Sequence, residues 1–382
     1  MNLEEIKELV SCLRIMPDPR RDHGKKHELV DIVLIILLGV IAKCDDLEEV
    51  ESWAEEREDW LKAFLDLPNG IPSHDTLNRV VGLLNPVALQ DCFSSWLNRT
   101  SSEGKVLAVD GKTLRRSYDK GKEQEALHLV NVWNADDHII LGQEAVNTKS
   151  NEIIAIPIVL DRIDITGAIV TIDAMGCQRN IAAKIRDKGA DYLLALKGNQ
   201  PTLEQDVIEL LREHRQAGTC DFYETVEKDH GRIETRRCFV TSNIFMLGAE
   251  KDWKDIRSVA MIESIREING RETTETRYFI SSCPPVASEI AAAARKHWGI
   301  ENTLHWSLDV SFNEDRSRLR QQVAAQNFSF IKKFVISLIK NEPTPKMSLK
   351  RKRLKACHND NFLLNVLFSN VNKEIQRFPR KK

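Results

Sequence analysis

Apolar residues along the first hundred positions recur with the spacing of helices. In EEVESWAEEREDWLKAFLDL, residues 48–67, they fall on one side of a helical turn, which is typical of amphipathic helices packed on a core. Ser73 stands directly before another such segment and is a suitable N-cap. The polar stretch TSSEG, residues 100–104, ends this part and has the composition of a linker.

After the linker the pattern changes to short apolar runs separated by helical segments. The runs that predict strands lie at 105–110, 125–133, 139–147, 168–176 and 191–198. The helical patterns lie at 151–163, 178–189 and 201–218. This order predicts an α/β fold whose sheet contains both antiparallel and parallel neighbours.

Residues 221–283 return to a strand pattern before a helix resumes. The strand-like runs lie at 237–243, 258–270 and 274–282. Helical spacing then extends from Val286 to Leu308. It places His297, Glu301 and His305 four residues apart and therefore on one face of the helix. That face is compatible with a metal site, with part of one, or with simple packing.

Composition narrows the class of protein. The longest apolar run, Ile32–Ala42, has 11 residues, which suits a buried helix and is too short to cross a bilayer. The first residues lack the basic start of a secretory signal. The 8 cysteines include no C-x-x-C pair, so a disulfide framework or zinc ribbon is not expected. We therefore expect a protein of the reducing cytoplasm, without a membrane partner.

The formal net charge of −2 conceals an uneven distribution of charge. Residues 1–100 carry 11 Lys and Arg against 19 Asp and Glu, whereas residues 316–382 carry 17 against 3. A basic end on an acidic body indicates a polyanionic partner, although a solvated tail without a partner has the same composition. The basic stretch RRDHGKKH, residues 20–27, is an exception within the acidic N-terminal part.

Two aspartates each close an apolar strand and precede a small residue: Asp110 in AVDGK and Asp173 in TIDAM. A carboxylate at the end of a buried strand costs free energy unless it is paired or binds a cation. Two of them on one sheet could share a divalent ion such as Mg²⁺ or Mn²⁺. Alternatively, each caps a turn, a common role of Asp after a strand.

An ordered set of motifs resembles the insertion-sequence transposases of the DDE class, in particular the H-repeat-associated group. The motifs are VLAVDGKTLRRS (106–117), TIDAMGCQ (171–178), LLALKGNQPTL (193–203), DHGRIETR (229–236), YFISS (278–282) and HWGIENTLHWSLDVSFNEDRSRLR (297–320). Two further stretches, MPDPRRDHGKKHELVDIVLIILLGV (16–40) and GIPSHDTLNRVV (70–81), resemble the accessory domain of that group. The resemblance covers nearly the whole chain.

The resemblance implies a fold and a division of the chain. The fold class is α/β, a ribonuclease-H-like mixed sheet with a β-rich insertion, preceded by a helical N-terminal domain. The implied division is a helical accessory domain at 1–100, which could bind DNA ends, a catalytic domain at 101–220 and 284–340, the insertion at 221–283 and a basic tail at 341–382.

The resemblance also implies a chemistry. Asp110, Asp173 and Glu301 correspond to the family's three catalytic carboxylates, which hold Mg²⁺, with Mn²⁺ as a substitute and two ions expected. Two ions 3.5–4 Å apart are the usual means of activating an oxygen nucleophile and stabilising a leaving oxygen. The implied partners are double-stranded DNA, as element ends and as target, and a second copy of the chain, in a bacterial cytoplasm.

The helix that carries Glu301 departs from the wider superfamily's pattern of Tyr, Arg, Glu and Lys. Ala294 stands at the Tyr position, His297 at the Arg position, and Leu308 near the Lys position. The contacts of those side chains with DNA therefore cannot be transferred to this chain. Three later acids stay open as alternatives for the third carboxylate: Asp309, Glu314 and Asp315.

Basic residues in several motifs are candidates for phosphate contacts. These DNA-binding candidates are Lys197, Arg232, Arg295, Lys296, His297, Lys350, Arg351, Lys352 and Arg353. For Lys197 an ordinary turn explains the sequence equally well. For Arg232, in DHGRIETRR, a simple turn at Gly231 is slightly favoured over a basic hairpin that touches DNA.

Two other functions fit parts of the sequence. The chain could be a transposase-derived DNA-binding protein without catalysis, although Asp110, Asp173 and Glu301 are all present. A zinc hydrolase built on His297, Glu301 and His305 is disfavoured, since neither H-E-x-x-H nor a cysteine cluster accompanies it.

Overall fold

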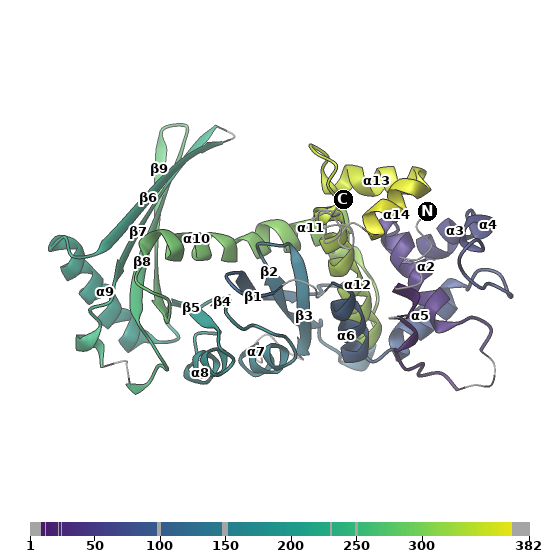
Figure 1. Ribbon diagram of the computed structural model, residues 1–382, viewed down its shortest axis with the longest axis horizontal. Coiled ribbons are helices and arrows are strands. Elements are labelled where there is room, and N and C mark those ends of the chain that lie inside the picture. The colour runs from purple at the N-terminus through teal and green to yellow at the C-terminus, as the bar shows by residue number, and fades with distance from the viewer. Residues whose placement is uncertain are drawn as a thin grey trace, which may run out of the picture.

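The computed structural model describes residues 9–11, 13–21, 23, 25–97, 101–146, 152–229, 231–248 and 251–368. Figure 1 shows an elongated molecule with a helical end, a central sheet and a group of long strands at the far end. The strands form one mixed sheet with helices on both faces, so the α/β class predicted from the sequence is confirmed.

The N-terminal part is helical, as its apolar spacing predicted. Its helices are α2 (Leu29–Ile41), α3 (Leu47–Glu55), α4 (Glu58–Leu61), α5 (His74–Leu83) and α6 (Pro86–Leu97). Helix α2 is buried on all sides, which explains why its sequence is almost uninterruptedly apolar. Ser73 accepts a hydrogen bond from the Thr76 amide and so caps α5. None of the described helices is long and apolar enough to span a bilayer.

The sheet has nine strands in the order β3-β2-β1-β4-β5-β9-β8-β7-β6. The strands are β1 (Val106–Thr113), β2 (His128–Asn134), β3 (Ile139–Val146), β4 (Ile169–Ile172), β5 (Asp191–Leu196), β6 (Asp221–Asp229), β7 (Arg232–Thr241), β8 (Ser258–Ile268) and β9 (Arg271–Ser281). Strands β1, β4 and β5 run parallel to one another, and the other neighbours are antiparallel.

Helices cover both faces of the sheet. Helices α7 (Glu152–Asp161) and α8 (Arg179–Asp187) lie on one face, and α10 (Ala287–His297) crosses the other from the long strands to the centre (Figure 1). Helix α9 (Pro201–Gln216) packs beside β7, β8 and β9. The course of α10 matters for function because it carries the chain from the long strands back to β1.

The strand-rich stretch at 221–283 is continuous with the central sheet through the pairing of β9 with β5. The sequence did not predict β6, whose apolar side chains Phe222, Tyr223 and Val226 are exposed. A strand exposed on both faces lacks the alternation that burial imposes, so its periodicity carries no signal. Strands β6 and β7 form a hairpin whose turn includes Gly231, with φ +75°.

The helix predicted from Val286 to Leu308 is not uniform. It consists of α10, a π-helical turn η5 (Ile300–His305) and α11 (Trp306–Ser311). The wider π turn interrupts the regular four-residue spacing, yet His297 faces Thr171 of β4 and His305 faces Asp110 of β1. Single π turns of this kind are frequent at functional sites. Three short 3₁₀ segments complete the described elements: η1 (Lys120–Lys122), η3 (Phe245–Leu247) and η6 (Glu314–Arg316).

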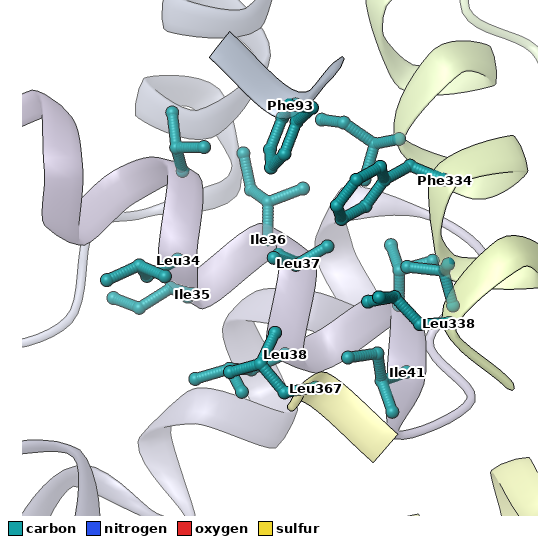
Figure 2. Close-up of a cluster of buried hydrophobic side chains, with 14 of the residues drawn as sticks. Leu34, Ile35, Ile36, Leu37, Leu38, Ile41, Phe93, Phe334, Leu338 and Leu367 are labelled. Atoms are coloured by element: carbon teal, nitrogen blue, oxygen red, sulfur yellow. The ribbon is translucent and has the colours of Figure 1, made fainter. Parts of the chain in front are cut away.

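Helix α12 (Gln322–Asn341) lies between the sheet and the N-terminal helices and contacts both. In the apolar cluster of Figure 2, Phe334 and Leu338 of α12 meet Phe93 of α6 and side chains of α2. The ring centroids of Phe334 and Phe93 are 4.4 Å apart. Because one helix serves both sides, the N-terminal helices are fixed against the sheet.

The segment predicted to be a basic tail begins with two packed helices, and that part of the prediction is wrong. They are α13 (Leu349–His358) and α14 (Asp360–Leu367), both in contact with α2 and α12. Residues 369–382 lie outside the described residues. Arg353, which belongs to the basic run of α13, is buried, with only 1% of its surface exposed.

Arg353 fastens α13 to the C-terminal end of α2. Its guanidinium donates to the Val40 carbonyl at 2.9 Å and to the Cys44 carbonyl at 3.3 Å, and it pairs with Asp45 at 2.9 Å. It also lies over the Phe312 ring, 3.9 Å from the centroid. The carbonyls at the end of a helix need such donors, and Arg353 supplies them from a distant part of the chain.

We expect Arg353→Ala to lower the free energy of unfolding by about 3 kcal/mol or more, because Asp45 and the α2 carbonyls would lose their buried donor. Arg351→Ala, two residues away on the exposed side of α13, removes the same kind of side chain and should cost no more than about 0.5 kcal/mol. Urea unfolding of the two variants makes the comparison. Equal losses would contradict the buried position of Arg353.

Candidate active site

The parallel pairing of β1 and β4 sets Asp110 and Asp173 side by side. Val109 pairs with Ile172, and Asp110 and Asp173 are the next residues of the two segments. Asp173 directly follows β4 as predicted, but β1 continues to Thr113, so the prediction that Asp110 closes its strand is wrong. Neighbouring strands lie about 4.8 Å apart, so the two carboxylates start from adjacent positions. Asp173 Oδ1 also accepts the amides of Met175 at 3.1 Å and Gly176 at 3.3 Å. For Asp173, the turn-capping role considered from the sequence is therefore present as well.

The glycine after Asp110 is required by close packing. A Cβ at Gly111 would lie 2.3 Å from Glu152 Oε1 and 2.4 Å from His128 Nε2. These two side chains are buried and form a pair in which His128 Nε2 stands 2.5 Å from Glu152 Oε1. Sequence reasoning missed this pair; its only signals were a histidine inside an apolar run and a small residue after Asp110.

Glu301 lies in η5, which packs against β1 beside Asp110. Burial, together with the charges of Asp173, Glu301 and Glu152, raises the pKa of Asp110 to about 7, against the opposing hydrogen bond from the Gly111 amide. Burial and the charge of Asp173 also raise the pKa of Glu301, against the opposing effect of Arg277. The three carboxylates expected from the sequence therefore lie within electrostatic reach of one another.

His305 stands between Asp110 and the interior. Its Nδ1 is 3.4 Å from Asp110 Oδ2, and its buried Nε2 has no hydrogen-bond partner among the described residues. Burial lowers its pKa to about 3, helped by the charges of Lys112 and Lys333. A neutral imidazole at this place can donate to the Asp110 carboxylate but cannot neutralise it.

The chemistry of the donor set suits a hard divalent cation. The three converging groups are carboxylates, the ligands that Mg²⁺ and Mn²⁺ prefer. A buried carboxylate with like-charged neighbours, as Asp110 is, gains most from a cation nearby. Among the described residues, however, no three His, Cys, Asp or Glu side chains already stand close enough together to hold a metal ion. This applies equally to the set His297, Glu301 and His305.

The alternative acids for the third position are engaged elsewhere. Asp309 pairs with Lys112 at 2.7 Å, and Asp315 pairs with Arg115 at 3.3 Å. Glu314 is buried and accepts the Ser329 hydroxyl at 2.7 Å. The acids that raise the pKa of Asp110 are Asp173, Glu301 and Glu152.

A cavity of about 480 Å³ opens between α10 and strands β7–β9 and reaches Glu301. Its lining includes Arg236, Arg266, Arg277, Arg295, Trp298 and Glu301. The Arg277 guanidinium lies over the Trp298 ring, 3.6 Å from the centroid, at the end nearest Glu301. The cavity thus offers cationic and flat aromatic groups beside the carboxylates, the combination used to bind single nucleic-acid strands.

Two arginines that line this cavity, Arg236 and Arg266, share one buried acid. Glu234 is 7% exposed and pairs with Arg232 at 3.1 Å and with Arg266 at 3.3 Å. It also pairs with Arg236. Arg295 reaches Glu227 at 3.2 Å. Arg232 does not line the cavity, and the acids Glu227 and Glu275 line it together with the arginines.

Some of the other DNA-binding candidates are exposed, and others are buried and cannot reach DNA. Lys197, Lys350 and Arg351 are exposed. Lys352 is buried and donates to the Ile339 carbonyl at 3.2 Å, and Arg353 is held as described above. The prediction that these last two contact phosphate is wrong, because their charged groups face the interior.

The two candidates at the end of α10 also have partners inside the protein. His297 Nδ1 stands 3.0 Å from the Thr171 hydroxyl, and burial lowers its pKa to about 4. It is therefore neutral at pH 7 and cannot act as a cation toward phosphate. Lys296 pairs with Asp136.

Sequence comparisons match two families to the chain. Residues 10–97 match the family described as DDE_Tnp_1-associated, and residues 101–338 match the family described as Transposase DDE domain. YncI of Escherichia coli O157:H7, named as a transposase, is 40% identical over 376 residues, with 95% of each chain covered. YhhI of E. coli strain K12, named as an H repeat-associated transposase, is 39% identical over 374 residues, with 95% of this chain and 98% of YhhI covered.

Among solved structures, a piggyBac transposase synaptic complex with hairpin DNA gives a TM-score of 0.41 at 12% identity. The alignment covers 100% of this chain and 81% of that one. This structural similarity is too slight to support conclusions about the site.

The raised pKa of Asp110 predicts a pH dependence of stability in the metal-free protein. The folded state holds the proton up to about pH 7, whereas the unfolded chain releases it near 3.8. The stabilisation is present below the lower value and is lost as the pH rises toward the upper one. Asp110→Asn should abolish this loss, so wild type should lose at least about 1 kcal/mol more than the variant.

Urea unfolding at pH 5 and pH 7.5 in the presence of a chelator measures the difference. Asp206→Asn, an exposed change on α9, serves as the control and should follow wild type. Equal pH dependence in wild type and Asp110→Asn would contradict the buried, charge-crowded position of Asp110.

Proposed function

The chain belongs to the family of transposases with a DDE domain, as its H-repeat-associated motifs predicted, and on this premise we propose that it cuts and joins DNA. The proposed reaction is cleavage at the ends of its own insertion element followed by transfer of the freed 3′ hydroxyl to target DNA. The observation that carries the proposal is the convergence of Asp110, Asp173 and Glu301 from three separate elements.

We propose a ribonuclease-H-like core for the catalytic part. Its support is the strand order β3-β2-β1-β4-β5, with β1–β3 antiparallel and β4 and β5 parallel to β1. In this reading β6–β9 are the insertion at 221–283, the helices before β1 form the accessory domain, and α10 returns the chain to the core. Asp173 then lies at the carboxyl end of β4, a usual place for active sites in α/β sheets, with Asp110 beside it in β1.

In the proposed site, Asp110, Asp173 and Glu301 would hold two divalent ions. Such ions would activate the attacking oxygen and stabilise the leaving oxygen of the phosphodiester. His305 orients the Asp110 carboxylate. Gly111, which has no Cβ, leaves room for the His128–Glu152 pair to pack against β1. The turn amides of Met175 and Gly176 fix one oxygen of Asp173.

The cavity between α10 and β7–β9 is the proposed path of the reacting DNA strand. Its guanidinium-rich wall around Glu234 suits the phosphate backbone, and Trp298 suits a base. The arginines already have acidic partners, so binding would exchange these partners for phosphates. Exposed Lys197, Lys350 and Arg351 remain proposals for contacts outside the cavity.

An insertion element has two ends, so one chain with one carboxylate site must act beside a second copy. We therefore include a homodimer on DNA in the proposal. Double-stranded DNA is then the partner in both steps: as the element end that is cleaved and as the target that is joined.

Cleavage of the element's own ends, mapped strand by strand in Mn²⁺ or Mg²⁺, tests the proposal. Glu301→Gln keeps the side chain's size and removes one charge, so cleavage should fall by about 100-fold or more while DNA binding persists. Glu289→Gln makes the same change on an exposed position of α10 and should leave cleavage unchanged.

A fully active Glu301→Gln would refute the assignment of the third carboxylate. Asp309→Asn, tested in parallel, would then show whether the acid paired with Lys112 takes that place. A wild-type protein that binds the ends and never cuts them would favour the non-catalytic DNA-binding protein.

A further inference from the structure

A second basic cavity lies in the N-terminal part, away from the carboxylates. It has a volume of about 530 Å³ and is formed by the loop at residues 19–27 and one face of α5. Its basic lining residues are Arg20, Arg21, His23, Lys25, Lys26, His27 and Arg79. Thr76 and Leu83 complete the α5 face, and no acidic residue lines it among the described residues.

The concentration of charge here contrasts with its surroundings. Residues 1–100 contain 11 Lys and Arg against 19 Asp and Glu, yet Arg20, Arg21, Lys25, Lys26 and Arg79 gather at this one cavity. Within this acidic part of the chain, the cavity is therefore a local site of positive charge that suits an anion. Asp22 belongs to the loop in sequence but lies outside the described residues.

Internal contacts hold the loop in place. The Arg20 side chain donates two hydrogen bonds of 2.9 Å to the Asp18 carboxylate, and Lys25 pairs with the same carboxylate at 3.3 Å. The Asn69 side chain donates to the Lys26 carbonyl at 2.6 Å. The anchor is thus made by Asp18, Arg20 and Lys25, which frees the remaining cations for a ligand.

Three exposed cations of the cavity have no ion-pair partner among the described residues: Arg21, Lys26 and Arg79. The buried Nδ1 of His27 likewise lacks a hydrogen-bond partner there. Cations brought together without an acid repel one another, and an anion would relieve this repulsion.

Helix α5 ties this cavity rigidly to the catalytic part. Asn327 of α12 donates to the Val81 and Leu84 carbonyls at 2.8 and 2.9 Å. Gln321, just before α12, donates to the Gly82 carbonyl at 3.1 Å. Figure 1 shows α5 at the end of the molecule opposite β6–β9, with α12 between α5 and the sheet.

We propose that this cavity binds backbone phosphates of duplex DNA at a distance from the cleavage site. The inference rests on the proposed function, since DNA is the polyanion that a transposase must hold. Arginine, lysine and a threonine hydroxyl are the usual phosphate contacts of DNA-binding proteins. Cations on both the loop and α5 suit several successive phosphates, and the fixed α12 link makes their spacing from Glu301 constant.

The salt dependence of DNA binding tests the proposal. A variant with Arg21→Ala, Lys26→Ala and Arg79→Ala is compared with wild type by titrating a 40-base-pair duplex at several salt concentrations without divalent metal. Each phosphate contact contributes about 0.9 to the slope of log K against log salt, so the slope should fall by about 2 to 3.

The matched control removes three exposed cations of the same region that do not line the cavity: Arg14→Ala, Lys43→Ala and Lys62→Ala. Its slope should stay at the wild-type value, and thermal melting confirms that both variants fold. An unchanged slope in the cavity variant, or an equal fall in the control, would overturn the proposal. Because no metal is present, cleavage plays no part, so the outcome is independent of whether Asp110, Asp173 and Glu301 are catalytic.

Discussion

The parallel pairing of β1 with β4 is the constraint on which the candidate site depends. It sets Asp110, inside β1, beside Asp173, which follows β4, and burial opposes the charge of Asp110. The surrounding sequence accommodates that cost: Gly111 makes room for the His128–Glu152 pair, and neutral His305 faces the Asp110 carboxylate. The divalent ions of the proposed function would relieve this unfavourable charge.

Helix α12 gives the site its fixed surroundings. It packs on β3, on the N-terminal helices and on α13 and α14, so the helical end and the sheet move as one packed unit. Buried polar groups specify this packing: Lys333 donates to Gln143 of β3 at 2.8 Å, and Ser337 accepts the Ile140 amide at 3.1 Å. Burial lowers the pKa of Lys333 to about 7, helped by the charge of Lys112.

Much of the fold could be predicted from local patterns in the sequence. Buried strands such as β1 and β4 show as apolar runs, and Ser73 marks the start of α5, because these features depend on near neighbours alone. Strand β6 was missed because both its faces are exposed, and the π turn at Ile300–His305 has no periodic signature.

The limits at the candidate site follow the same logic. The chain's own pattern singled out Asp110 and Asp173, and family resemblance singled out Glu301, but nothing local revealed the His128–Glu152 pair or the arginines around Glu234. The error over Arg353 has a clear cause: a basic run reads as a solvated surface, whereas the carbonyls at the end of α2 draw one arginine inward from far along the chain. Contacts between distant segments are decided by tertiary packing, which composition does not encode.

The central claim, that β1, β4 and η5 deliver one shared metal site, is tested most directly by metal-directed cleavage of the protein backbone. Fe²⁺ would replace Mg²⁺ at carboxylate ligands, and with ascorbate and peroxide it cuts the chain beside its binding site. We expect three cuts, near Asp110, Asp173 and Glu301, all suppressed by excess Mg²⁺ and all lost in Asp110→Asn. Cuts near Asp309, Glu314 or Asp315 without one near Glu301 would contradict the account.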